Sequence, residues 1–218
     1  MKLEIPVTPN INMIHGTPIL MGEVPNPEAM NQGLMERILA VRERDRGVQV
    51  RNYGGWQSEG DLWNWEGEAF DQYRFWVHDC IIRMAALVTE EIDPGNVDVS
   101  YRAASWANVN HHGDYNARHI HPDVDWAVVY YVSVGTPGDA NLGRNGRLEL
   151  HDSRFLAQSS NLAGYGFGLG LLVDPLPGKI VQFPAWVEHS VHPFYGEGTR
   201  ISIACNVKIT GGRHVGLK

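Results

Sequence analysis

The segment Thr-Arg-Ile-Ser-Ile-Ala-Cys-Asn-Val-Lys, residues 199–208, decides the fold of this chain. Successive side chains of an extended strand point to opposite faces, so this segment would have one purely apolar face and one polar face. The polar face would carry Arg200, Ser202, Ala204 and Asn206. A surface salt bridge is one explanation for the arginine, but an arginine in an otherwise apolar strand needs a partner. The alternation therefore favours a strand that lines the polar interior of a barrel.

Other extended segments fill the second half of the chain. They are rich in β-branched and aromatic residues and are separated by Gly and Pro turns. Two helical patterns precede most of them, one starting at Asn26-Pro27-Glu28 and ending near Gly47, the other running from about Glu66 to Ile92. This order predicts a mainly β fold with bracing helices, a double-stranded β-helix (jelly roll, cupin-like). The expected strands cover residues 17–24, 97–110, 126–134, 147–151, 179–184, 187–192 and 199–208.

The domain organisation is simple. The chain has 218 residues without an internal repeat, low-complexity tract or linker, and this length suits one domain with a full core. We expect a single domain over residues 1–218. Residues 1–96 would form a helical and loop support region, and residues 97–210 the jelly-roll core.

Composition excludes several classes of function. The net charge of −7 argues against a general nucleic-acid binder, which would show a basic face. No signal peptide and no apolar run long enough for a membrane span is found, so no membrane partner is expected. The two cysteines, Cys80 and Cys205, lie far apart in apolar patterns. They are expected to be reduced core residues, which is consistent with a cytoplasmic location.

Residues that can bind a metal occur next to two of the expected strands. His121 and Asp123 come just before the strand at 126–134, and His189 follows the strand at 179–184. Two histidines and one carboxylate on one face of a metal leave positions open for a co-substrate and dioxygen, as non-haem Fe(II) oxygenases require. A lone His-x-Asp is weak evidence, because it often occurs by chance.

The Arg200-x-Ser202 pair strengthens this interpretation. Arginine offers a carboxylate a planar fork of donors, and serine adds a hydroxyl donor, so the pair suits one end of a dicarboxylate co-substrate. The combination predicts a 2-oxoglutarate-dependent Fe(II) oxygenase.

Several short motifs are spread over the chain. They are Gly54-Gly55-Trp56-Gln57-Ser58, Trp106-Ala107-Asn108-Val109-Asn110, Gly113-Asp114-Tyr115-Asn116, His119-x-His121-Pro122, Gly178-x-x-x-x-Phe183-Pro184, His189-x-Val191 and Arg200-x-Ser202-x-x-x-Asn206. In these motifs the chain resembles, over nearly its whole length, the putative 2-oxoglutarate/Fe(II)-dependent oxygenase family of the double-stranded β-helix superfamily. It departs from the family in Trp126-Ala127-Val128-Val129-Tyr130-Tyr131, where members usually read Ser-Gly before the two tyrosines, and at Asp152-Ser153-Arg154, where members read Asp-Pro-Arg.

The resemblance implies a cofactor set and roles for five residues. Fe(II) would be held by His121, Asp123 and His189, and the distal carboxylate of 2-oxoglutarate by Arg200 and Ser202. The cofactors would be Fe(II), 2-oxoglutarate and O2, with ascorbate helpful in vitro. An aspartate in the carboxylate position also argues against a halogenase, which needs that position vacant for halide.

The first ligand has an alternative. The family pattern is His-x-His, and His119 lies on the same side of an extended strand as His121, so His119 could be a ligand itself. We favour His121 and Asp123, and expect His119 to contact the co-substrate or substrate.

Further candidates for the site are polar residues in strands. Tyr130 or Tyr131 could give a hydroxyl to the co-substrate carboxylate, or both could simply pack. Asn108 and Asn110 alternate with Val109 and are expected to face the pocket, since Asn is uncommon in a strand interior. The Trp-rich loop at 51–65 is either a substrate wall or a set of plugs for the barrel end. Residues 152–177 are either a lid over the substrate or an ordinary insertion.

The predicted activity is hydroxylation of an unactivated C–H bond in a small molecule, such as an amino acid or a natural-product intermediate. Desaturation, cyclisation and demethylation remain open, as does a peptide side chain as substrate. One rival is a three-histidine cupin-type metalloenzyme that uses His119, His121 and His189 without 2-oxoglutarate. Another is a non-catalytic jelly-roll binding module. The oligomeric state is open, and a homodimer is compatible with the sequence.

Overall fold

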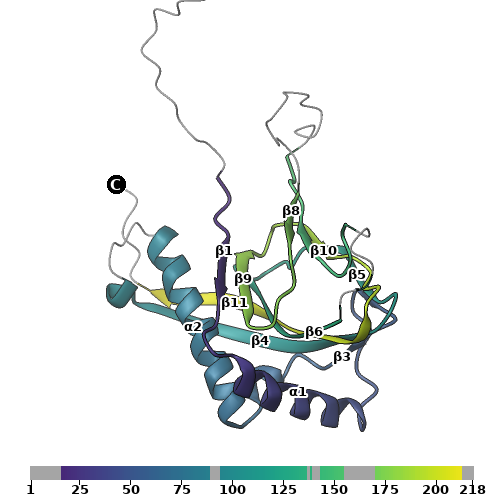
Figure 1. Ribbon diagram of the computed structural model, residues 1–218. Coiled ribbons are helices and arrows are strands. Elements are labelled where there is room, and N and C mark those ends of the chain that lie inside the picture. Colours follow the sequence, from purple (N-terminus) through teal and green to yellow (C-terminus); the bar gives the residue numbers. More distant parts are fainter. Residues whose placement is uncertain (1–15, 89–93, 137, 139–142, 155–169, 213–218) are drawn as a thin grey trace, which may run out of the picture.

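The computed structural model describes residues 16–88, 94–136, 138, 143–154 and 170–212. These residues form two antiparallel sheets with both α-helices beneath the larger one (Figure 1). The six-stranded sheet has the order β1-β9-β6-β11-β4-β3, and the five-stranded sheet the order β2-β5-β10-β7-β8. The predicted double-stranded β-helix with bracing helices is therefore confirmed.

The elements follow the predicted order. The helices are α1 (Glu28–Arg42), α2 (Glu68–Val88) and the short 3-10 turns η1 (Leu62–Asn64) and η2 (Pro94–Asn96). The larger sheet contains β1 (Leu20–Glu23), β3 (Trp56–Gln57), β4 (Val99–Asn110), β6 (Trp126–Thr136), β9 (Lys179–Pro184) and β11 (Glu197–Gly212). The smaller sheet contains β2 (Asn52–Tyr53), β5 (Tyr115–His119), β7 (Leu148–Leu150), β8 (Leu171–Val173) and β10 (His189–Val191).

The helix ends differ slightly from the sequence prediction. Asn26 has a φ of +48°, Pro27 occupies the cap position without a side-chain cap, and α1 begins at Glu28. The helix ends at Arg42, because the following residues turn back and Gly47, with a φ of +66°, leads into a backbone hydrogen bond from Val48 to Gln57. Residues 89–93, the predicted end of the second helix, lie outside the described residues.

The two faces of the larger sheet bury different kinds of side chain. In β4 and β11, Val109 pairs with Ile201, and Ala107 with Ile203, on the face covered by the helices. The alternate positions face the smaller sheet, where Asn108 pairs directly with Ser202 in the register. The helix-covered face is the main hydrophobic core. Its fully buried members include Leu34, Ile38, Leu62, Val77, Ile81, Ala107, Val109, Ile201, Ile203 and Val207.

The Trp-rich loop contributes to this core. Trp56, Trp63 and Trp65 pack against it, and the Trp56 indole donates a hydrogen bond to the Asp45 carbonyl (3.0 Å). The tryptophans of this loop are therefore plugs, whereas Arg51, Gln57 and Gly60 of the same loop line the cavity described below. Residues 155–169, most of the predicted lid, lie outside the described residues, and β8 follows them.

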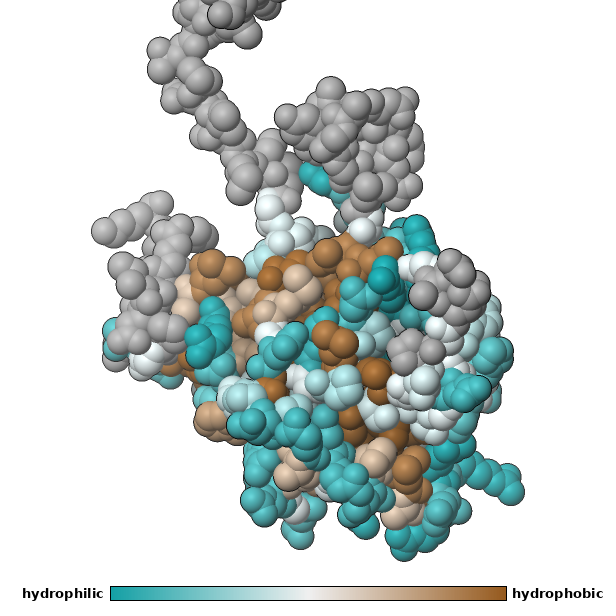
Figure 2. Space-filling model, in the orientation of Figure 1, coloured by the Kyte–Doolittle hydropathy of each residue, from teal (hydrophilic) through white to brown (hydrophobic). Residues whose placement is uncertain are grey.

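Two further observations concern the surface and the cysteines. Hydrophobic residues gather in the upper part of the face shown in Figure 2, and the exposed apolar side chains include Met21 of β1 and Leu171 of β8. No helix among the described residues is long and apolar enough to cross a membrane. Cys80 and Cys205 are both free and buried, as expected from the sequence.

Candidate active site

A cavity of about 390 Å³ lies between the two sheets. Its wall combines the inward side chains of β4, β6, β9 and β11 with residues of β5 and β10. Apolar residues such as Leu148 and Phe183 form part of the wall, and polar groups cluster at two places. A small, partly apolar cavity with a few convergent polar groups is the usual form of a small-molecule site.

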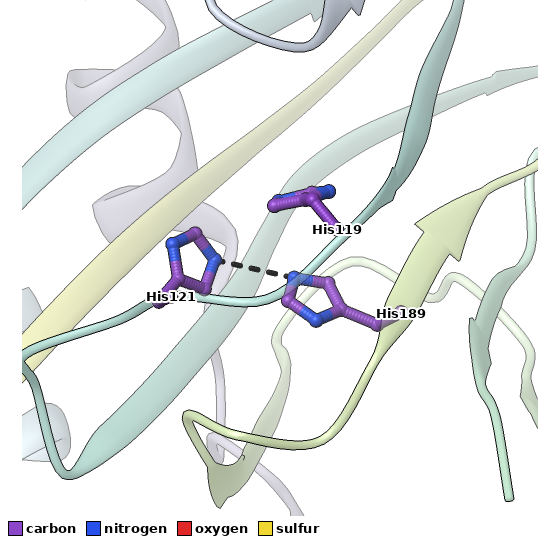
Figure 3. Close-up of side chains that lie close together, drawn as sticks. All are labelled: His119, His121 and His189. Atoms are coloured by element: carbon purple, nitrogen blue, oxygen red, sulfur yellow. Dashed lines mark hydrogen bonds between the residues drawn. The ribbon is translucent and has the colours of Figure 1, made fainter. Parts of the chain in front are cut away.

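The first cluster contains three histidines that come from the smaller sheet. His119 ends β5 and pairs in register with His189, which begins β10, and His121 follows two residues after His119 (Figure 3). One ring nitrogen from each lies within 4.8 Å of the others. His121 Nε2 and His189 Nε2 are 3.2 Å apart. This spacing is close to that of two nitrogens bound to one metal at about 2.1 Å each, so the group fits a metal ion.

The outer nitrogens of the three rings are already engaged. His119 Nδ1 bonds to the Ala117 carbonyl (2.6 Å), and His189 Nδ1 bonds to the Val187 carbonyl (2.9 Å). His121 Nδ1 lies 3.3 Å from the side-chain amide of Asn206. Hydrogen bonds to one ring nitrogen fix the orientation and tautomer of a histidine whose other nitrogen binds a metal. The three Nε2 atoms are thus left for a shared ligand.

Burial keeps these histidines neutral. It lowers the pKa of His189 to about 3, with further lowering from the neighbouring His119 and His121. It likewise lowers the pKa of His121 to about 4, with a contribution from His119. The pKa of His119 is lowered chiefly by burial and also by the Arg51 guanidinium. Neutral imidazoles are the form that binds metal, so the site is ready for metal near neutral pH.

The structure does not bring Asp123 to the histidines. Its side chain is exposed, and its residue is absent from both the histidine group and the cavity wall. The backbone at Asp123 has a φ of +65°, which turns the chain after Pro122. Residues two positions apart share a side only within a strand, and β5 has already ended at His119, so the spacing of His121 and Asp123 does not bring their side chains together. The assignment of Asp123 as a ligand stays a prediction that the geometry does not favour.

The second cluster surrounds Arg200 and belongs to the larger sheet. Arg200 is 1% exposed, and its Nη1 donates to Ser202 Oγ (3.3 Å). Its Nε and Nη2 are buried without a hydrogen-bond partner among the described residues, as are Tyr131 Oη and Asn108 Oδ1. Leaving several buried polar atoms unpaired is costly, so these groups fit a bound polar molecule that pairs with them. Burial lowers the pKa of Arg200, whereas the nearby Tyr131 raises it.

The two neighbouring tyrosines have different environments. The Tyr131 ring lies beneath the Arg200 guanidinium at 5.3 Å, and its side chain packs with the cavity-side cluster. Tyr130 faces the helices, where its hydroxyl donates to Asn31 Oδ1 (2.5 Å) in α1. The prediction that Tyr130 contacts the co-substrate is therefore not supported. Alternation puts one tyrosine in and one out, and the sequence did not reveal which.

Several residues of the wall were not predicted as site residues. Trp106 lies on the inward face of β4, on the same side as Asn108, so strand alternation could have found it. Gln57, Asn116 and Arg51 also line the cavity. Nothing local to the sequence placed them there, because they arrive through the pairing of β2 and β3 with β5 and β4.

Comparison with known proteins agrees with this geometry. Residues 104–206 match the family model described as "Putative 2OG-Fe(II) oxygenase". The matched segment contains β5, β10 and most of β4 and β11, and so includes both polar clusters of the cavity. The predicted family, enzyme class (a 2-oxoglutarate-dependent dioxygenase) and cofactors (Fe(II) with 2-oxoglutarate and O2) are confirmed.

Solved structures with the same fold are distant in sequence. A prolyl-4-hydroxylase from Pseudomonas putida aligns at a TM-score of 0.61 and 16% identity, covering 88% of this chain and 93% of that one. HygX from Streptomyces hygroscopicus, with nickel, 2-oxoglutarate and hygromycin B bound, aligns at 0.56 and 12%, covering 89% and 84%. The viral collagen prolyl hydroxylase of Paramecium bursaria Chlorella virus-1, as a 2OG complex, aligns at 0.55 and 10%, covering 88% and 96%. No curated protein shows significant sequence similarity to this chain.

Proposed function

We propose that this oxygenase hydroxylates an unactivated C–H bond of a small molecule, with Fe(II) bound by His119, His121 and His189. The observation that carries the proposal is the convergence of two clusters on one cavity. Three imidazole nitrogens lie within 4.8 Å of one another, and the buried Arg200 lines the same cavity with unpaired donors. Bound Fe(II) together with 2-oxoglutarate and O2 supplies the oxidising power for such a reaction, with succinate and CO2 as products.

The three-histidine ligand set replaces the set with Asp123. His119 belongs to the group and, with Nδ1 bonded to the Ala117 carbonyl, would bind through Nε2, whereas Asp123 is not part of the group. His121 would bind through Nε2, which requires a proton on Nδ1 and an acceptor for that proton. A two-fold rotation of the Asn206 amide provides this acceptor, because the amide nitrogen and oxygen are interchangeable in shape and Asn206 Oδ1 is otherwise unpaired.

The distal carboxylate of 2-oxoglutarate would bind at the Arg200 end. Arg200 offers Nε and Nη2 as donors, and Ser202 and Tyr131 add hydroxyls next to it. Asn108, opposite Ser202 in the register, presents its amide to the same space. Every one of these groups is buried, so a carboxylate here would be bound without competing water, which strengthens charge-assisted hydrogen bonds.

The remaining space sets the size of the substrate. The cavity of about 390 Å³ must hold 2-oxoglutarate as well, so a small molecule, or one side chain of a larger one, fits best. Trp106, Phe183 and Leu148 exclude water from the space between the two clusters. We further propose that residues 1–218 act as one domain, with residues 1–96 supporting the core. The cytoplasmic location and a homodimer stay predictions.

The first experiment measures co-substrate binding directly. Fe(II) protein is titrated with 2-oxoglutarate without oxygen, and the visible absorption band of the chelate is recorded; succinate formation is then measured with O2 and ascorbate. The wild type should show the band, and His189→Gln should lose both the band and tight iron binding. The matched control is His112→Gln, an exposed histidine outside the cavity wall, which should leave both unchanged. A wild-type protein that binds iron but never gives the band would favour the three-histidine enzyme without 2-oxoglutarate.

A second pair of variants separates the two ligand sets. His119→Gln should weaken iron binding by an order of magnitude or more, while Asp123→Asn should have little effect, because its side chain is exposed and outside the group. The iron affinity of each variant, measured by competition with a chelator, shows whether His119 or Asp123 is the ligand. Strong loss in Asp123→Asn with retention in His119→Gln would restore the original assignment.

A further inference from the structure

The charges of the cavity wall are unbalanced. The described residues that line it include two arginines, Arg51 and Arg200, and no aspartate or glutamate. This contrasts with the whole chain, in which Asp and Glu number 25 and Lys and Arg number 18. Arg200 is assigned to 2-oxoglutarate, so Arg51 remains as a second cation without a role.

The backbone of Arg51 is held by the sheet that carries the histidines, while its residue is exposed at the edge of the cavity. It immediately precedes β2, whose residue Asn52 pairs with Asn116 of β5, and its own carbonyl accepts a hydrogen bond from the Ala117 amide (2.9 Å). Its φ of +59° is in the left-handed region that L side chains rarely adopt. Such a conformation persists only where the surroundings enforce it, and it is common at ligand sites. The backbone of Arg51 is thus fixed two residues from the histidine ligand on β5.

The guanidinium of Arg51 has no anionic partner in the described part of the chain. A comparable arginine on the same strand system, Arg118, is paired with Glu188. Arg51 enters no such ion pair, yet it lies against the cavity. An arginine is therefore available at the cavity beside His119, with planar donors that suit a carboxylate.

The ligand set makes an anion in this space more favourable. Three neutral imidazoles leave the full charge of a divalent metal uncompensated, whereas a set with one aspartate would neutralise part of it. With Arg51 and Arg200 added, the charge of 2-oxoglutarate does not balance the positive charge of the cavity. A second anion would be attracted by this field.

We propose that Arg51 binds a carboxylate of the substrate, so that the enzyme acts on small carboxylic acids. This inference rests on the proposed function. Gln57 and Asn116, which are buried and line the same cavity, add neutral hydrogen-bonding groups around the acid. The carboxylate at Arg51 would orient the carbon skeleton toward the three histidines and away from the Arg200 end.

The test compares acids with their neutral analogues. Anaerobic Fe(II) protein saturated with 2-oxoglutarate is mixed with N-acetyl amino acids and the corresponding primary amides, and the compounds retained on ultrafiltration are identified by mass spectrometry. Wild type should retain one or more acids in preference to their amides. Arg51→Gln should lower this retention on the order of tenfold, Arg51→Lys should keep part of it, and the control Arg118→Gln should leave it unchanged.

The contrary results separate failure of this inference from failure of the proposed function. Equal retention of acids and amides, retention of no acid, or an unchanged preference in Arg51→Gln overturns the inference. The affinity for 2-oxoglutarate is measured in the same variants from the chelate band. If Arg51→Gln loses that affinity as Arg200 variants do, Arg51 serves the co-substrate and the inference is also wrong. If the wild type shows no chelate band, the proposed function itself has failed.

Discussion

The two faces of strands β4 and β11 show how one pair of strands serves stability on one side and chemistry on the other. On the helix-covered face, Ile201 and Ile203 are fully buried among apolar neighbours. On that face of β4, the Ser105 hydroxyl is paired with the Tyr73 hydroxyl at 3.3 Å. On the cavity face, Arg200 and Asn108 are equally buried but keep unpaired polar atoms.

The unpaired polar atoms on the cavity face indicate where a ligand binds. Unpaired buried polar atoms destabilise a fold, so a protein retains them where something else completes the hydrogen bonds. The helix-covered face stabilises the fold and needs no ligand. If the co-substrate binds at the cavity face as proposed, it completes these hydrogen bonds and should stabilise the protein by binding only its folded state.

The largest effect on stability is expected on the helix-covered face. Ile203→Ala removes a fully buried side chain and leaves a cavity, which should lower the free energy of unfolding by about 2–5 kcal/mol. Denaturant unfolding measures the change. The neighbour on the opposite face, Ser202→Ala, is the matched control and should cost much less. Equal losses would mean that the two faces do not divide their roles.

The next largest effect concerns binding on the cavity face. Arg200→Met removes charge-assisted hydrogen bonds to 2-oxoglutarate and should weaken its binding by about 10- to 150-fold, which corresponds to about 1.5–3 kcal/mol. Arg200→Lys keeps the charge without the planar fork and should fall in between. Without ligand, Arg200→Met should unfold no more easily than the wild type, because it removes a buried cation with no partner carboxylate. A large loss of stability in the empty protein would show that Arg200 is structural.

A smaller effect is expected from pH in the metal-free protein. The folded pKa values of His121 and His189, about 4 and about 3, are below the ordinary value of 6.5, so the unfolded state binds protons more readily as pH falls. Stability should therefore be constant with respect to these groups above pH 6.5 and decrease below it, until the folded pKa values are reached. The slope should be no more than about 1.4 kcal/mol per pH unit for each histidine. His121→Gln should flatten the profile; a slope that is unchanged would assign the effect to other groups.

The smallest effect is expected outside both faces. Tyr53 of β2 and Tyr115 of β5 stack at 4.9 Å between ring centroids, and both are exposed. Tyr115→Ala should cost about 0.5–1.5 kcal/mol, near the lower end because the pair is solvated. Since β2 follows Arg51 directly, the same variant should weaken retention of acids slightly without changing the affinity for 2-oxoglutarate. Thermal unfolding and the ultrafiltration assay measure the two effects.

The sequence by itself determined the strand pattern and the position of the Arg200 cluster on the cavity face. Alternation in residues 199–208 placed Arg200 and Ser202 on one face and the apolar residues on the other, because the pleat of a strand fixes side-chain direction. The same reasoning found Asn108, but Asn110 bonds to Asn52 and is not among the residues that line the cavity. Helical spacing found both helices. These features depend on neighbours in the sequence, which is why they could be predicted.

Only the tertiary structure decided which residues form the histidine cluster. His119 meets His189 through the pairing of β5 with β10, a contact between residues 70 positions apart in the numbering. Asp123 leaves the site because the backbone reverses at a φ of +65°, beyond the end of β5, where alternation no longer applies. Arg51 and Trp106 meet at the cavity through separate strands. Local pattern fixes the direction of a side chain within one strand, but the partner that it meets depends on sheet pairing over the whole chain.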